Sequence, residues 1–224
     1  MERTTLVRSL LVATLAFWVG FYAVGGSIKP GYSHLSSYVS ELNATGTAWA
    51  TTLGFAGFLP LALLLAAFLL AAAPLVYVRG TSRVGYLLLW SQPIAFLGVV
   101  FAPCDPGCPA VGSPSQALHN FIGLVTYFAA GLAFVLLSFA PGLTGRAGIW
   151  RHLLRAAGVV WIALFLFMLQ PQLEDWRGLL QRGADVLLAM VLVFLAWQRI
   201  PKPRGRAHLR IDRSMAASSR GGGN

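Results

Sequence analysis

The side chains best suited to chemistry lie in three polar segments that interrupt a very apolar chain. The first segment, residues 27–48, contains His34 and Glu41, and the second, residues 103–109, is followed by His119. The third segment, residues 172–185, ends at Asp185. An imidazole titrates near neutral pH and can act as a general base when a carboxylate orients it. The candidate catalytic residues are therefore His34, Glu41, His119 and Asp185.

No established catalytic motif accompanies these residues. The sequence contains neither a Gly-x-Ser-x-Gly nucleophile turn nor a His-Glu-x-x-His metal motif. An enzyme that acts on an outer-leaflet lipid is therefore an alternative hypothesis, and a scaffold or assembly factor that presents its loops to a protein partner is a further one.

Ligand binding is the leading hypothesis, because forked guanidinium groups favour phosphate and carboxylate. The expected ligand is a lipid headgroup or a similar polar molecule in an outward-facing pocket. The predicted ligand-binding residues are polar and come from all three segments: Ser40, Glu41, Asn43, Asp105, His119, Arg177, Gln181, Arg182 and Asp185. We predict no cofactor.

The spacing of residues in the first and third segments predicts local helical structure. Leu35, Val39 and Leu42 recur at helical intervals, as the apolar stripe of a short amphipathic helix. In the third segment Glu174 precedes Arg177, and Arg182 precedes Asp185, each by three residues. This spacing predicts two ion pairs, the second of which would neutralise a carboxylate at the membrane.

The two cysteines, Cys104 and Cys108, flank a Pro-Gly turn in the second segment. On an oxidising side of the membrane, this spacing favours a disulfide that closes a tight loop. Free thiols are one alternative, and a metal site that adds His119 is another. Because no fourth ligand is evident, we predict no metal.

Six apolar stretches must position these segments. The chain has 224 residues, is 57% hydrophobic and only 11% charged, and has a mean hydropathy of +0.69. Each stretch approaches the roughly 20 residues that cross a bilayer as a helix. The stretches run over Leu6–Gly26, Trp49–Ala73, Val84–Ala102, Leu118–Ala140, Leu153–Leu169 and Gly183–Ile200.

These stretches predict an all-α integral membrane bundle of six transmembrane helices, with short amphipathic segments in the outer loops. One transmembrane domain takes residues 1–200, and residues 201–224 form a basic, disordered cytoplasmic tail. The first stretch also resembles a signal peptide, because Arg3 and Arg8 precede it and Ala23–Gly25 offers small residues for cleavage. Gln92 should face the bundle interior, and Pro93 should kink its helix.

The distribution of charge orients the bundle. Three basic residues, Lys29, Arg177 and Arg182, share one side with five of the seven acids. The other 14 of the 17 basic residues fall on the opposite side: Arg3, Arg8, Arg79, Arg83, Arg146, Arg151, Arg155, Arg199, Lys202, Arg204, Arg206, Arg210, Arg213 and Arg220. Because short cytoplasmic loops carry the excess of Lys and Arg, both termini should be cytoplasmic.

The same distribution explains the net charge of +10 without nucleic acid as a partner. The expected partners are membrane lipids, and a protein that binds the outer loops remains open. The preference for Arg over Lys points to a GC-rich bacterial genome. The expected location is therefore the plasma membrane or a bacterial inner membrane.

Three short motifs make the sequence resemble the DUF998 family of multi-pass membrane proteins. They are Ser40–Gly46, Cys104–Cys108 followed by His119, and Gly178–Arg182. The resemblance covers Leu6 to Ile200 and implies no reaction, because the family has no assigned function. The first segment is also loosely similar to the FRAG1/DRAM/Sfk1 group of six-helix proteins, some of which act in lipid remodelling or membrane trafficking.

Overall fold

The computed structural model describes residues 2–143 and 148–197. Within them, six helical spans are long and apolar enough to cross a membrane. The expected tail at 201–224 lies outside the described residues. The helices are α1 (Arg3–Ile28), α2 (Ala50–Leu53), α3 (Leu59–Ala72), α4 (Thr81–Leu88), α5 (Ser91–Phe101), α6 (Pro114–Leu137), α7 (Gly148–Met168) and α8 (Arg177–Trp197). Shorter helical turns are η1 (Val39–Asn43), η2 (Gly54–Phe58), η3 (Ala73–Leu75) and η5 (Pro171–Trp176).

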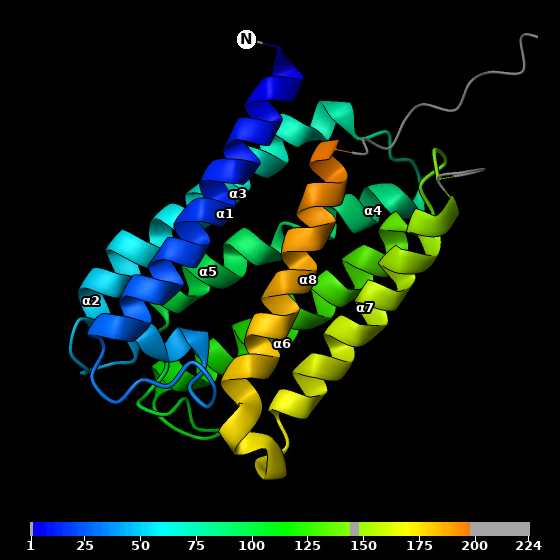
Figure 1. The fold of residues 1–224 in the computed structure, drawn as a ribbon. Coiled ribbons are helices and arrows are strands. Elements are labelled where there is room, and N and C mark those ends of the chain that lie inside the picture. Colours follow the sequence, from blue (N-terminus) through cyan, green and yellow to red (C-terminus); the bar gives the residue numbers. More distant parts are fainter. Residues whose placement is uncertain (1, 144–147, 198–224) are drawn as a thin grey trace, which may run out of the picture.

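Consecutive spans run antiparallel and close into a ring (Figure 1). α1 packs on α3, α3 packs on α5, and α6 packs on both α4 and α5. α7 lies between α6 and α8, and α8 returns to contact α1. The predicted all-α bundle is therefore confirmed, and each span borders the interior of the ring.

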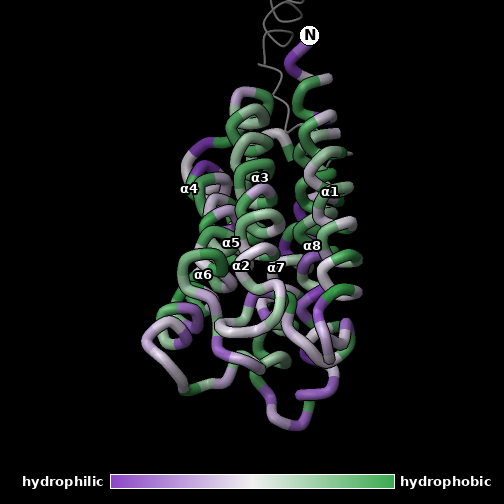
Figure 2. Tube along the Cα trace, turned by 90° about the vertical axis from the view of Figure 1, so that its left-hand side faces the viewer, coloured by the Kyte–Doolittle hydropathy of each residue, from purple (hydrophilic) through white to green (hydrophobic). Residues whose placement is uncertain are grey.

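The polar segments gather at one end of this ring. The loops that follow α1, α5 and α7 lie together there, and we call this end the disulfide end (Figure 1). Hydrophobic residues cover the middle of the helices, whereas hydrophilic residues concentrate in these loops (Figure 2). The apolar belt and the six spans identify a multi-pass membrane protein.

The third span is broken near Pro93, as the sequence predicts. α4 ends at Leu88, and α5 begins at Ser91 with Pro93 in its first turn. Because proline has no backbone N–H, the carbonyl of Leu89 cannot take its usual helical partner there. It accepts instead from the amide of Gln92 at 3.1 Å. The Gln92 side chain is buried, as expected.

Glycines bring α6 and α7 into close contact. A Cβ atom added at Gly158 would lie 2.7 Å from the carbonyl oxygen of Gly131. Small residues at such crossings let helix backbones approach in a membrane, where packing drives association. This contact fixes the spacing of the two helices that border the pocket described below.

Candidate functional site

Residues at the start of α8, in the third segment, hold the first segment in place through backbone contacts. Gly178, at the start of α8, lies so close to the first segment that an added Cβ would meet the carbonyl oxygens of His34 and Leu35, each at 2.9 Å. The amide of Leu179 then donates to the Leu35 carbonyl at 2.9 Å. Only glycine leaves room for this approach of two backbones.

Arg182 fixes the same segment with its guanidinium group. It donates to the carbonyl oxygens of His34 at 2.8 Å and Gly178 at 2.9 Å, and to the Tyr32 hydroxyl at 2.6 Å. It also contacts Nδ1 of His34 at 2.9 Å. Because a guanidinium group only donates, this Nδ1 accepts, and burial together with the nearby Arg182 charge lowers the pKa of His34.

The expected ion pair between Arg182 and Asp185 is not formed. In the described part of the chain, salt bridges join Arg177 to Glu174 at 3.5 Å and to Glu41 at 3.9 Å. The first of these confirms the predicted pair. The Arg182 donors are instead taken by loop carbonyls, which the sequence does not reveal as its partners.

The first segment folds into the mouth of the bundle as a short 3-10 turn instead of an amphipathic helix. The turn, η1, is closed by Glu41, which accepts from the Tyr38 amide at 2.8 Å. Gln181 accepts from the Val39 amide at 2.6 Å. Val39 and Leu42 are buried, but Leu35 is exposed, so the predicted apolar stripe is not continuous. Contacts with α8 decide the local structure here.

Glu41 and Arg177 meet beneath this turn. Arg177 donates to the Ser36 carbonyl at 3.1 Å, and its guanidinium carbon lies 4.7 Å from the centre of the Tyr38 ring. Burial raises the pKa of Glu41 despite the hydrogen bond from the Tyr38 amide and the nearby Arg177 charge. The pair therefore fastens the first segment to the third.

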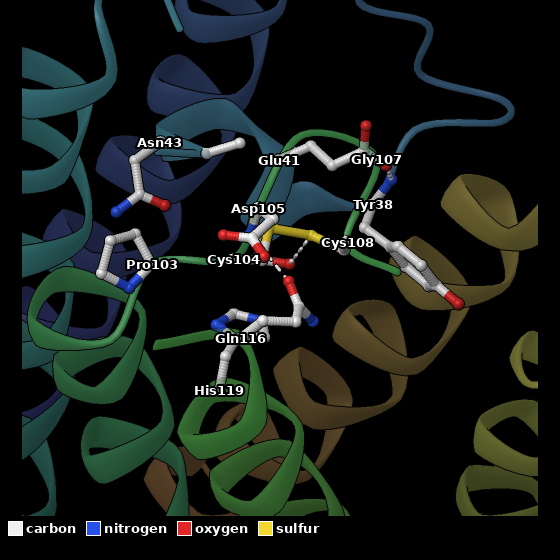
Figure 3. Close-up of a disulfide and its surroundings, with 12 residues drawn as sticks. Tyr38, Glu41, Asn43, Pro103, Cys104, Asp105, Gly107, Cys108, Gln116 and His119 are labelled. Carbon is white, nitrogen blue, oxygen red and sulfur yellow. Dashed lines mark hydrogen bonds between the residues drawn. A yellow bond between two sulfur atoms is a disulfide. The ribbon is translucent and has the colours of Figure 1, made fainter. Parts of the chain in front are cut away.

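Cys104 and Cys108 form the predicted disulfide, which closes the second segment. Gly107 has a φ of +80°, which makes glycine the favoured residue in the turn between them. Figure 3 shows Tyr38, Glu41 and His119 arranged around the sulfur atoms. The hydroxyl of Ser40 lies 3.4 Å from the Cys108 sulfur.

Asp105 has a structural role in this loop. Its carboxylate accepts from the backbone amide of Ser113 at 2.7 Å and from the Ser113 hydroxyl at 2.8 Å. These two bonds lower the pKa of Asp105. Asn43 also has a structural role, because it is buried and its amide donates to the Val99 carbonyl at 2.8 Å.

His119 points from α6 toward the disulfide. Its Nδ1 lies 2.9 Å from the Ala102 carbonyl oxygen. Because a carbonyl oxygen only accepts, this ring nitrogen carries the proton. A ligand atom of His119 and both sulfur atoms lie within 4.8 Å of one another. The disulfide bond uses the two sulfurs that a metal ion would need as thiolates.

A cavity of about 80 Å³ lies on the axis of the bundle, and we call it the axial cavity. Every span contributes a side chain to its wall. The polar and aromatic residues that line it are Tyr22, Ser40, Phe58, Gln92, Phe96, His119, Thr126, Tyr127, Trp161, Gln181 and Asp185. The Asp185 carboxylate accepts a hydrogen bond from Tyr22 at 3.0 Å.

A second cavity of about 520 Å³ lies between α6, α7 and α8 at the disulfide end, and we call it the mouth pocket. Ligand pockets in proteins commonly measure about 300–1,000 Å³. Its wall is polar near the loops and apolar along α6 and α7. Ser40, His119, Tyr127 and Gln181 line both cavities, so the two adjoin.

The predicted site residues divide into two groups. Those that line one or both cavities are Ser40, His119, Arg177, Gln181 and Asp185. Those that line neither are His34, Glu41, Asn43, Asp105 and Arg182. The four candidate catalytic residues thus do not share one pocket, and only His119 and Asp185 meet in the axial cavity.

Sequence reasoning missed the aromatic wall of the axial cavity. Its rings come from five different spans: Tyr22, Phe58, Phe96, Tyr127 and Trp161. A hydropathy profile does not separate an aromatic residue that faces the axis from one that faces lipid. The sequence signal that could have revealed this cavity is Asp185, because a carboxylate at membrane depth indicates a polar interior.

Comparison with known proteins agrees with the resemblance to the DUF998 family. A family described as a protein of unknown function, DUF998, matches residues 11–198. The chain belongs to the DUF998 family. Neither a curated protein nor a solved structure matches it. In this DUF998 protein, the motifs that resemble the family are the segments that hold the three loops together at the disulfide end.

Proposed function

We propose that this DUF998 protein binds the headgroup of a membrane lipid in the mouth pocket. The observation that carries the proposal is the pocket's two-sided wall. Arg177, Asn120 and Ser40 line its polar part, and Leu124 and Leu169 line its apolar part. A lipid has the same two-part chemistry, with a polar headgroup on apolar chains.

The pocket is placed for entry from the side of the bundle. Leu124 is 45% exposed and Leu169 is 56% exposed, although both line the pocket. The apolar part of the wall therefore reaches the surface that faces acyl chains. In the proposed complex the headgroup enters between α6 and α7, while the chains stay in the bilayer.

The proposal also assigns the leaflet. With the disulfide end directed away from the cytoplasm, the arginines of the opposite end, such as Arg8, Arg79 and Arg155, lie on the cytoplasmic side, as the positive-inside rule requires. Both termini are then cytoplasmic, and the pocket takes its lipid from the outer leaflet. Disulfides also form and persist on that oxidising side of the membrane.

Filling the pocket tests the proposal. Gly123 lines both cavities, and a Cβ added there meets nothing within 4 Å. Gly123→Leu should therefore fill the pocket without displacing α6. The matched control is Gly20→Leu, because Gly20 is an exposed mid-helix residue whose added Cβ also meets nothing within 4 Å.

Native mass spectrometry of the purified protein supplies the readout. The wild type and Gly20→Leu should retain a lipid, and Gly123→Leu should lower its occupancy about tenfold, or ~1.4 kcal/mol of binding free energy. A wild-type protein without lipid would contradict the proposal, as would equal retention by the two leucine variants.

A further inference from the structure

The axial cavity is unusual in its charge. Among the described residues that line it, Asp185 and His119 are the only acidic or basic side chains. Among the described residues no salt bridge involves Asp185, whose carboxylate accepts a hydrogen bond from Tyr22. Arg182, the nearest cation in sequence, donates to loop carbonyls, and its charge acts on the Asp185 carboxylate without a salt bridge.

The remaining wall of the cavity also favours a positive charge. The faces of Trp, Tyr and Phe rings attract ammonium groups, and such rings surround choline-like ligands in proteins. Five rings from five spans converge here, and they include two contacting pairs: Tyr127 and Trp161, with centroids 5.3 Å apart, and Phe58 and Phe96, with centroids 6.3 Å apart. Gln92 and Gln181 add amide oxygens that can accept hydrogen bonds.

The size of the cavity limits what it can hold. One water needs about 10–15 Å³ of such space. A volume of about 80 Å³ therefore suits a few heavy atoms and excludes an acyl chain or a sugar. A primary or a quaternary ammonium group has this size.

We propose that the axial cavity binds the ammonium group of a zwitterionic lipid headgroup, with Asp185 as its counter-ion. This inference rests on the proposed lipid binding in the mouth pocket and names the headgroup class. The ammonium passes the junction at Ser40 and Gln181, which line both cavities. The phosphate then lies in the mouth pocket beside Arg177, which also pairs with Glu41 and Glu174.

The test compares headgroups in nanodiscs by native mass spectrometry. The wild type is offered phosphatidylethanolamine, phosphatidylcholine and phosphatidylglycerol, of which the last has no ammonium group. It should prefer an ammonium lipid. Asp185→Asn keeps the shape of the side chain and an acceptor for Tyr22, and it should reduce that preference about 30-fold, the lower end for a broken buried charge pair.

Two further variants guard against a general loss of structure. Phe96→Leu removes one ring of the wall without changing charge, and it should weaken the preference for ammonium while lipid retention persists. Asp175→Asn removes an exposed carboxylate that lines neither cavity. This control should keep the wild-type preference.

The outcomes separate the two proposals. If the wild type retains lipids without regard to headgroup, or if Asp185→Asn keeps the preference, the ammonium site is refuted while lipid binding stands. If no lipid is retained, soluble choline and ethanolamine are titrated against the protein by calorimetry. Binding that Asp185→Asn abolishes would support an ammonium site for free amines, and absence of binding would refute it.

Discussion

At the scale of single residues, Gly178 is the position where the first and third segments touch. Gly178→Ala should destabilise the protein by about 1–3 kcal/mol, because its methyl group would enter the space of three loop carbonyls, those of His34, Leu35 and Ser37. Thermal unfolding in detergent measures the change. Gly183→Ala is the matched control, since its Cβ would only touch Leu164 at 3.6 Å. Equal melting temperatures for the two variants would contradict this role.

Asp105 gives a prediction that depends on pH. Its pKa is lowered in the folded protein by the two bonds from Ser113, so its stabilising effect is present above the unfolded pKa of about 3.9 and is lost as the pH falls through the folded value. Asp105→Asn should therefore unfold at a lower temperature than the wild type at pH 5–8. The difference should shrink below about pH 3.9. A difference that stays constant down to pH 3 would argue against the two bonds as its source.

At the scale of elements, the spacing of α6 and α7 depends on their glycines. Gly158→Ala should destabilise the bundle by about 1–3 kcal/mol, because the new methyl group would lie 2.7 Å from the Gly131 carbonyl. Gly20→Ala makes the same change in open space and should stabilise α1 by about 0.5–1 kcal/mol. Unfolding in denaturant compares the two, and a stabilising Gly158→Ala would show that the helices are not in contact there.

Most of the elements follow from the sequence, because apolar length alone defines a membrane helix. The apolar run predicts that the last span starts at Gly183, whereas α8 begins at Arg177. Charged and amide side chains interrupt the apolar run there. Arg177 and Arg182 nevertheless fit into the helix, because they donate hydrogen bonds to loop carbonyls within the fold. Hydropathy does not reveal such partners.

The candidate site followed from the sequence only in part. Loop charge and motif placement predict at which end of the bundle the candidate site lies and which polar segments belong to it. The two cavities could not be predicted, since they depend on which ring or amide each helix turns toward the axis. Gln92 illustrates the limit: its inward direction could be predicted, but not that it lines a cavity with Trp161 and Asp185.

At the scale of the whole molecule, the proposed orientation can be measured directly. A reporter fused after Gly107 should lie outside the cytoplasm, and one fused after Gly80 should lie within it, because the two loops occupy opposite ends of the bundle. Alkaline phosphatase, which is active only outside, distinguishes the two sides. Activity from the Gly80 fusion alone would reverse the orientation and the proposed leaflet.

The central claim is that a lipid occupies the mouth pocket. The most direct measurement is labelling with a photoactivatable phospholipid, followed by mass-spectrometric mapping of the attached residues. We expect adducts concentrated on the pocket-lining stretches of α6 and α7, around Leu124 and Phe165, and their loss in Gly123→Leu. Labelling spread evenly around the bundle, or confined to the hollow at the opposite end beside Arg79 and Trp90, would contradict it.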